Sequence, residues 1–156
     1  MLPNMAVDSK LGAIKLLVDH LYNCGILADK LSFLQAVLAR ETLQSTILTD
    51  LVALPHARSR AVNRLGLALG VLPGEIDFPS GDACRPIRII CLLAVPTQAP
   101  DPYLGVLSRL ARNFSDDAFA DQLLGQSTPE QLFEHLNSST CQRLTLDERG
   151  APCKKY

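Results

Sequence analysis

The chain has 156 residues, of which 47% are hydrophobic and 20% are charged, and its formal net charge is -1 at pH 7. This composition predicts one domain with a full core, and the charge balance offers no attraction for nucleic acid or for an anionic membrane. The sequence contains neither an apolar run long enough to span a membrane nor a signal-peptide layout, so we expect a cytoplasmic protein without membrane insertion. Five cysteines without a CxxC pair favour reduced thiols over disulfides or a zinc site.

The first part of the chain predicts a helix from Asp8 or Ser9 to Cys24, with Gly25 as its stop signal. The residues assigned to its buried face are Leu11, Ile14, Val18, Leu21 and Tyr22. His20 is expected on the flank of this helix. Its spacing to Cys24 would suit two ligands of a metal ion, but the sequence offers no further ligand beside them, and we expect no metal and no cofactor.

A second helix is predicted from the cap residue Asp29 to about Leu43. Its buried face is assigned to Leu31, Leu34 and Leu38. Arg40 lies in its last turns, where two roles are open. The guanidinium group either points toward a functional site or complements the helix dipole at the C-terminal end.

Three apolar segments predict strands. A short run at residues 51–54 precedes Pro55, and residues 65–72 alternate bulky with small side chains. Residues 87–95 form an almost unbroken apolar run, which is typical of a central strand covered on both faces, with Cys91 in the core. Turns and loops are predicted around the segment Ile76-Asp77-Phe78, at Pro73-Gly74, at Pro79-Ser80-Gly81 and at Arg85-Pro86.

The C-terminal part predicts three helices, the first of which starts near Tyr103. The apolar residues assigned to the first two are Leu104, Leu107, Leu110, Ala111 and Phe114, then Phe119, Leu123 and Leu124. Thr128 and Gln131 form a capping-box pattern at the third helix, where His135 is expected to face solvent. We assign residues 1–137 to one domain and residues 138–156 to an extended or disordered tail.

His56 is the residue whose side chain is most clearly suited to a chemical role. It follows Pro55 at a predicted strand end, and a neutral imidazole is a nucleophile that can accept a phosphoryl group on a ring nitrogen. Guanidinium groups bind phosphate oxygens in a bidentate fork, which makes Arg40, Arg58 and Arg60 candidate partners. On residue chemistry alone, a histidine beside arginines is more often an ordinary surface residue.

A wider pattern surrounds this histidine. It consists of Arg40-Glu41, Ser45-Thr46 and the segment Ala53-Leu54-Pro55-His56-Ala57-Arg58, followed in order by Ile76-Asp77-Phe78, Pro86-Ile87 and an amphipathic helix after Pro96. The pattern resembles the enzyme IIA domains of the bacterial phosphotransferase system, of the fructose/mannitol and nitrogen-regulatory type. The resemblance extends from about Ser9 to about Leu136. It implies an α/β fold with three layers, in which helices flank a mixed central β-sheet.

The chain departs from this family at three places. The link between the Ser-Thr pair and the Pro-His segment is glycine-rich in the family but reads Ile47-Leu48-Thr49-Asp50 here. Tyr103 stands where the family has a second histidine, and a tyrosine hydroxyl can donate a hydrogen bond but cannot become a cation. Because only about eight residues precede the first helix, we expect the sheet to lack the edge strand that the family has there.

The resemblance implies a phosphocarrier in which His56 accepts a phosphoryl group from an HPr-like protein. Arg40 would neutralise charge, and Ser45 or Thr46 and Tyr103 would supply hydrogen bonds. Arg58 would bind the phosphate or support its binding. Tyr103 could equally serve as an apolar cap of the core. The next partner would be a IIB domain or a regulatory target, and the nitrogen-type regulatory role is favoured. The alternative is a degenerate binding module that regulates a partner without phosphotransfer.

Overall fold

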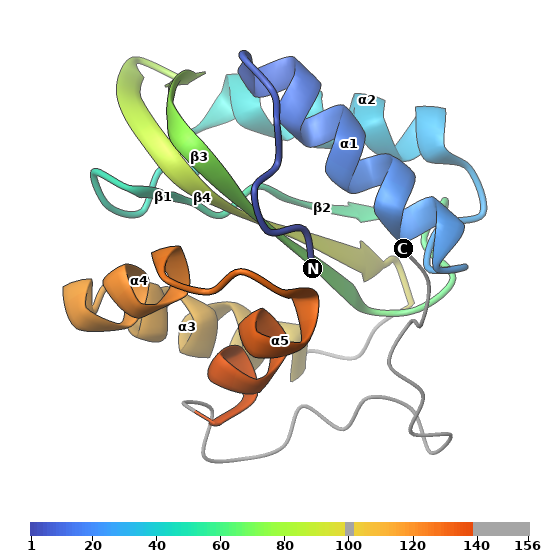
Figure 1. The fold of residues 1–156 in the computed structure, drawn as a ribbon. Coiled ribbons are helices and arrows are strands. Elements are labelled where there is room, and N and C mark those ends of the chain that lie inside the picture. Colours follow the sequence, from blue (N-terminus) through green and yellow to red (C-terminus); the bar gives the residue numbers. More distant parts are fainter. Residues whose placement is uncertain (99–101, 139–156) are drawn as a thin grey trace.

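The computed structural model describes residues 1–98 and 102–138, and these form five helices and four strands (Figure 1). The helices are α1 (Lys10–Asn23), α2 (Lys30–Leu43), α3 (Pro102–Phe114), α4 (Asp117–Leu124) and α5 (Pro129–Ser138). The strands are β1 (Val52–Ala53), β2 (His56–Ser59), β3 (Gly66–Ser80) and β4 (Ala83–Pro96). Except for Ser138, which ends α5, the predicted tail lies outside the described residues.

β4 is the central strand of a mixed sheet. β3 pairs with one of its edges in antiparallel orientation. β1 and β2 pair one after the other with its opposite edge, both in parallel orientation, so that Val52 lies opposite Ile89 and His56 lies opposite Leu93. The almost unbroken apolar run of β4 fits this position, because a central strand is covered by side chains on both of its faces.

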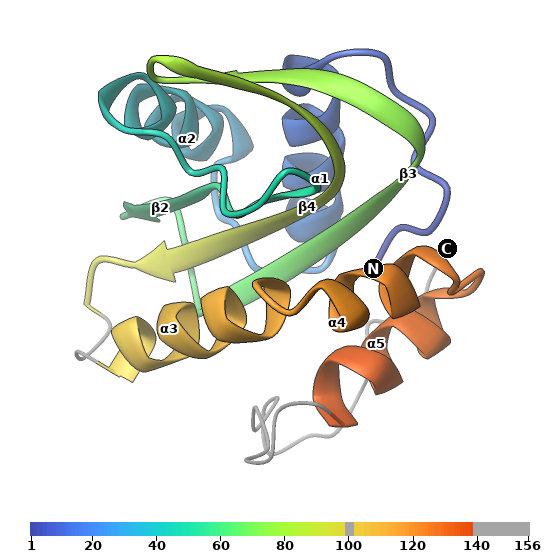
Figure 2. The ribbon, with the colours of Figure 1, turned by 90° about the vertical axis from the view of Figure 1, so that its left-hand side faces the viewer.

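The helices form two layers around the sheet (Figures 1 and 2). α1 and α2 pack on one face, over a core that includes Leu17, Phe33 and Phe78. α3, α4 and α5 pack on the other face, over a core that includes Phe114 and Leu123. The predicted three-layer α/β domain with a mixed central sheet is therefore confirmed.

Caps that the sequence predicts are present at the helix starts. The Asp29 carboxylate accepts hydrogen bonds from the backbone N–H groups of Leu31 and Ser32 at the start of α2. At α5, the Thr128 hydroxyl oxygen accepts from the Gln131 backbone N–H, and the Gln131 side chain accepts from the Thr128 N–H. These caps satisfy N–H groups that have no partner within the helix.

The predicted buried faces of the first two helices are partly wrong. Leu11 is 49% exposed and Tyr22 is 44% exposed, so the buried face of α1 is turned away from both. In α2, Leu31 is 66% exposed, while the buried residues are Phe33, Val37 and Glu41. Leu34 and Leu38 do pack against the core as predicted, but the fully buried stripe of this helix ends in a carboxylate.

β3 and β4 extend further than expected. Arg85-Pro86, predicted as a loop, lies inside β4 and pairs with the segment Asp77-Phe78. Pro73-Gly74 lies inside β3, at an irregularity in the pairing between Val71 and Ile76. The predicted turn at Gly81 does connect the two strands, and its φ of 58° suits glycine. The two-stranded end of the hairpin tolerates prolines because its outer edges need no hydrogen-bond donor.

The segment before α1 covers part of the outer edge of β3. The backbone N–H of Leu2 donates to the carbonyl of Leu69 at 2.8 Å, and that of Met5 donates to the carbonyl of Val71 at 2.7 Å. Leu2 forms an isolated parallel bridge with Gly70, and no strand precedes α1 in the described part of the chain. Within that part, no helix has both the length and the hydropathy needed to cross a membrane.

Candidate functional site

His56 is the first residue of β2 and is half-buried. Its Nδ1 atom lies 3.0 Å from the backbone carbonyl oxygen of Leu54. Because a carbonyl oxygen can only accept, Nδ1 carries the proton in this contact. In the neutral ring the lone pair is then on Nε2, so Nε2 is the nucleophilic atom of this side chain.

Arg58 and Tyr103 gather on the same side of the sheet as His56. Ala57 points into the core under α1 and α2, so the alternation of a strand places His56 and Arg58 on the opposite face. The Arg58 guanidinium donates to the carbonyl oxygen of Thr97 at 2.6 Å and lies 5.5 Å from the centre of the Tyr103 ring. In Figure 2, β4 ends beside the start of α3, the helix that carries Tyr103, and β2 lies on the other side of β4 in this view.

Tyr103 also contacts the apolar core under α3, so both of its predicted roles are compatible with its position. The aromatic ring faces a guanidinium group, and such a cation–π contact does not require the hydroxyl group. The hydroxyl can therefore be removed by substitution with phenylalanine while the ring contact is kept.

Arg40 occupies the last turn of α2, as predicted. Its Nη1 atom donates to the backbone carbonyl of Gln44, the C-cap residue, at 2.9 Å. This is the contact expected of a cation that stabilises a helix C-terminus. In this arrangement the guanidinium group is directed to the end of its own helix.

Ser45 and Thr46 differ in what their hydroxyl groups do. The Ser45 oxygen accepts a hydrogen bond from the Ile47 backbone N–H at 3.2 Å, which leaves its own proton available to a ligand. Thr46 is only 7% exposed, and its hydroxyl donates to the carboxylate of Glu41. The two residues therefore differ: the hydroxyl proton of Thr46 is engaged by the Glu41 carboxylate, whereas the Ser45 oxygen acts as an acceptor.

The loop that replaces the glycine-rich link is a short, closed hairpin. The backbone N–H groups of Leu48 and Thr49 both donate to the carbonyl of Val52, and Ile47 forms an antiparallel bridge with Ala53. The backbone groups of this loop are thus bonded within the loop, while its apolar side chains Ile47, Leu48 and Leu51 pack against the two cores and Asp50 is exposed.

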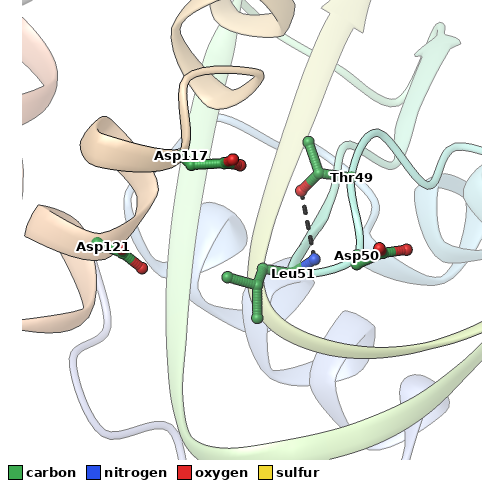
Figure 3. Close-up of a pocket in the computed structure, with 5 residues that line it drawn as sticks. All are labelled: Thr49, Asp50, Leu51, Asp117 and Asp121. Atoms are coloured by element: carbon green, nitrogen blue, oxygen red, sulfur yellow. Dashed lines mark hydrogen bonds between the residues drawn. The ribbon is translucent and has the colours of Figure 1, made fainter.

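One side of this loop borders an open hollow (Figure 3). The hollow is lined by Thr49, Asp50 and Leu51 from the loop and by Asp117 and Asp121 from α4. Three carboxylates around one hollow repel an anion. This hollow is therefore a poor site for an anion such as phosphate.

A buried ionic cluster was missed by the sequence analysis. Glu41 is 2% exposed, and its carboxylate accepts hydrogen bonds from Lys10 at 2.8 Å, from Ser80 at 2.6 Å and from Thr46. The cluster joins the start of α1, the end of α2 and the turn between β3 and β4. The signal that could have revealed it is the spacing of Phe33, Val37 and Glu41, which places the glutamate on a buried helix face.

The other two histidines have packing roles. His135, predicted to face solvent, instead stacks on Phe119 with ring centres 4.7 Å apart and has a buried Nε2 atom. The expectation is wrong because α5 turns this side of its last turns toward α4. His20 lies 3.1 Å from the amino group of Met1, and burial, together with that positive charge, lowers its pKa. In the described ranges, no group of three or more His, Cys, Asp or Glu residues is placed to hold a metal ion.

Comparison with known proteins gives relatives of one kind. The chain is 27% identical over 135 residues to the 2-O-alpha-mannosyl-D-glycerate-specific EIIABC component of the phosphotransferase system from Escherichia coli K12. This match covers 86% of the chain but 20% of the relative, so the chain spans about a fifth of that protein's length.

Two solved structures are similar over most of the chain. The nitrogen regulatory protein IIA-Ntr from Neisseria meningitidis is 30% identical with a TM-score of 0.76, and the match covers 86% of this chain and 90% of that one. The mannitol enzyme IIA of Escherichia coli, solved in complex with phosphorylated mannitol enzyme IIB, is 20% identical with a TM-score of 0.69. That match covers 87% of this chain and 94% of the other and concerns the fold alone.

A family model matches residues 2–139, which is most of the chain. Its description is "Phosphoenolpyruvate-dependent sugar phosphotransferase system, EIIA 2". This match agrees with the motif around His56 and with the three-layer fold. The chain therefore belongs to the EIIA 2 family of the phosphoenolpyruvate-dependent sugar phosphotransferase system.

Proposed function

We propose that this chain is a cytoplasmic phosphocarrier that accepts a phosphoryl group on Nε2 of His56 from the phosphohistidine of an HPr-like protein. The observation that carries the proposal is the hydrogen bond from Nδ1 to the Leu54 carbonyl, because it leaves the lone pair on Nε2. In the transfer, the P–N bond of the donor breaks as the bond to Nε2 forms. The donor imidazole leaves with the electron pair of the broken bond, so no cofactor is required.

The same hydrogen bond assists the transfer electrostatically. When Nε2 takes the phosphoryl group, the ring becomes positively charged, and its Nδ1 proton still points at the Leu54 carbonyl oxygen. A fixed acceptor at 3.0 Å stabilises that charge as it develops and costs little reorganisation. Leu54 therefore contributes through its backbone, which no substitution of its side chain removes.

Three side chains are proposed to hold the phosphoryl group. Arg58 would leave its contact with the Thr97 carbonyl and pair with phosphate oxygens, a bidentate interaction that guanidinium groups favour. Tyr103 and Ser45 would donate hydroxyl protons. Arg40 could bind the phosphoryl group as well, but only if its guanidinium group releases the carbonyl of Gln44. Of the four side chains, it is therefore the weakest candidate.

Downstream of His56, we propose a regulatory target as the first candidate and a IIB domain as the second. The likeness to a nitrogen regulatory protein over 90% of that protein's chain supports the first. The solved complex of a mannitol enzyme IIA with its phosphorylated IIB partner supports the second. Transfer from the phosphorylated chain to an isolated IIB domain would separate the two candidates.

The test is phosphorylation in vitro. The protein is incubated with phosphoenolpyruvate, enzyme I and an HPr-type carrier from the sugar or nitrogen branch, and intact mass is measured before and after brief acid treatment. We expect one acid-labile phosphate on the wild type and on His20→Ala, the matched histidine control, and none on His56→Ala. A folded wild type that takes no label from any carrier would refute the phosphocarrier.

A second candidate function is a binding module that regulates a partner without phosphotransfer. It is favoured by Tyr103 in place of a histidine and by the closed hairpin of residues 47–53 in place of a glycine-rich link. Under this alternative, a partner would bind equally well to the wild type and to His56→Ala. Under the phosphocarrier proposal, the binding of a regulatory target would differ between the phosphorylated and unphosphorylated forms.

A further inference from the structure

Glu41 is a buried carboxylate whose position the phosphocarrier proposal does not explain. Both of its oxygens are bonded: one accepts from Lys10 and Ser80, and the other accepts from Thr46. A buried charge is costly unless it is paired and fully hydrogen-bonded, and apolar residues of similar size would fill the same space at lower cost. Burying this cluster therefore costs more free energy than filling the same space with apolar side chains would.

An unbroken series of hydrogen bonds leads from this cluster to His56. Thr46 donates its hydroxyl proton to Glu41, and its backbone N–H donates to the Ser80 hydroxyl oxygen at 3.0 Å. The carbonyl of Thr46 accepts the backbone N–H of Leu54 at 2.9 Å. The carbonyl of Leu54, in turn, accepts the Nδ1 proton of His56 at 3.0 Å.

The series passes through the backbones of two residues, Thr46 and Leu54, and both backbones are restrained. Thr46 is held on its side-chain, N–H and carbonyl atoms, so the two peptide groups that flank it have little freedom to rotate. Leu54 precedes Pro55 and is restricted to an extended conformation. The direction of the Leu54 carbonyl therefore depends on where Thr46 is held, and the tautomer of His56 depends on that carbonyl.

We propose that Glu41 is a positioning residue for His56, acting through Thr46 and the Leu54 carbonyl to hold the imidazole in the tautomer that exposes Nε2. This inference deepens the proposed function and rests on it for its consequence in phosphotransfer. Glu41 touches neither the imidazole nor the phosphoryl group. Its effect is to fix the acceptor that selects which ring nitrogen carries the proton.

The test uses three substitutions. Glu41→Gln keeps the shape of the side chain but removes the charge, and Thr46→Val keeps the shape but removes the hydroxyl that links Glu41 to the loop. Thr46→Ser restores that hydroxyl and should rescue the loss. Val37→Ala lies on the buried face of the same helix and serves as the control for destabilisation alone.

The first readout is the tautomer of His56, measured by nitrogen-15 NMR of the ring in the unphosphorylated protein at a pH where the imidazole is neutral. We expect the wild type, Thr46→Ser and Val37→Ala to hold the proton on Nδ1. Glu41→Gln and Thr46→Val should show a mixture of the two tautomers. If both keep the wild-type tautomer, the inference is overturned, whether or not the protein is a phosphocarrier.

The second readout is the rate of phosphoryl transfer to His56 well below the melting temperature of each variant. Loss of the partner that orients a metal-ligating histidine typically costs roughly tenfold to a hundredfold in metal affinity or activity, and the orienting role proposed here is of the same kind. We expect a loss of this size for Glu41→Gln and Thr46→Val and none for Val37→Ala. If the wild type accepts no phosphate and its His56 is a mixture of tautomers, both proposals are refuted. If the wild type holds the proton on Nδ1 and only the variants show a mixture, Glu41 positions His56 even if phosphotransfer fails.

Discussion

Replacing Lys10 by methionine is expected to destabilise the fold far more than a similar change at the surface. Lys10 lies at the start of α1, and its ammonium group is 2.8 Å from the Glu41 carboxylate. It also donates to the carbonyl of Pro79 and lies 4.7 Å above the ring of Phe78. Methionine keeps the length and most of the apolar stem but removes the charge.

The magnitude follows from what is left behind. The Glu41 side chain is 2% exposed, so its charge would remain buried with only the hydroxyl groups of Thr46 and Ser80 as donors. Breaking a buried ion pair in this way costs roughly 3 to 5 kcal/mol, and the 15% exposure of Lys10 favours the lower value because water can approach the vacated site. A loss of about 3 kcal/mol corresponds to a fall of about 6 to 12 °C in Tm for a domain of this size.

The assay is thermal unfolding followed by circular dichroism, with Lys30→Met as the matched control. Lys30 pairs with Asp19 at 2.7 Å, nearly the same distance, but both side chains are 46% exposed. Solvent screens such a pair, so the control should leave Tm nearly unchanged. The double variant Lys10→Met/Glu41→Gln should recover much of the loss, because it removes the uncompensated charge.

Equal Tm values for Lys10→Met and Lys30→Met would refute this reasoning. That result would mean that the cluster contributes no more than a surface pair and that water or a rearranged side chain compensates the carboxylate. Failure of the double variant to recover stability would point instead to lost packing against Phe78.

Three further predictions concern other parts of the molecule. Tyr103→Phe should slow phosphoryl transfer without lowering Tm, since it removes only the hydroxyl, and Tyr103→His should accelerate transfer if the missing imidazole is limiting; unchanged kinetics in both would remove this residue from the site. Burial lowers the pKa of His20 in the folded protein, so the unfolded chain binds a proton at this histidine more readily. The free energy of unfolding should therefore fall as pH drops below about 6.5. In denaturant titrations, His20→Gln should lose less stability over this pH range than the wild type. Gly81→Ala should destabilise more than Gly25→Ala in the same titrations: both glycines have positive φ, but a Cβ at Gly81 would lie 3.2 Å from the backbone nitrogen of Ser45, whereas Gly25 has open space around it.

The fold could be predicted to a large extent because periodicity and caps are local signals. The central strand and the caps at Asp29 and Thr128 follow from neighbouring residues, and the structure confirms them. The buried face of α2 could be assigned only in part: Leu34 and Leu38 pack against the core, but Leu31 is 66% exposed and the burial of Glu41 was not predicted. The spacing of Glu41 to Phe33 and Val37 could have indicated a buried position, but its pairing with Lys10 from another helix could not be predicted from neighbouring residues.

The candidate site could be predicted only as a set of residue types. The sequence indicated His56 and its cationic neighbours, but it did not indicate which ring nitrogen is free, because that depends on the Leu54 carbonyl. Nothing in the sequence favoured Ser45 or Thr46 over the other as a hydrogen-bond donor to phosphate. The structure distinguishes them, because the Thr46 hydroxyl donates to the Glu41 carboxylate. The contact between Arg58 and Tyr103 joins two segments that lie far apart in the chain, and it required the packing of α3 against the sheet.

The order of pairing along β4 has a consequence for how the chain reaches its native state. β3 and β4 are neighbours in sequence and meet through a tight turn, so their contacts can form early. β2 joins the sheet only through its parallel pairing with β4, and this pairing closes a long loop. The histidine should therefore reach its working position late in folding, and pulse-labelled hydrogen exchange should show protection of the β3–β4 amides before those of β2.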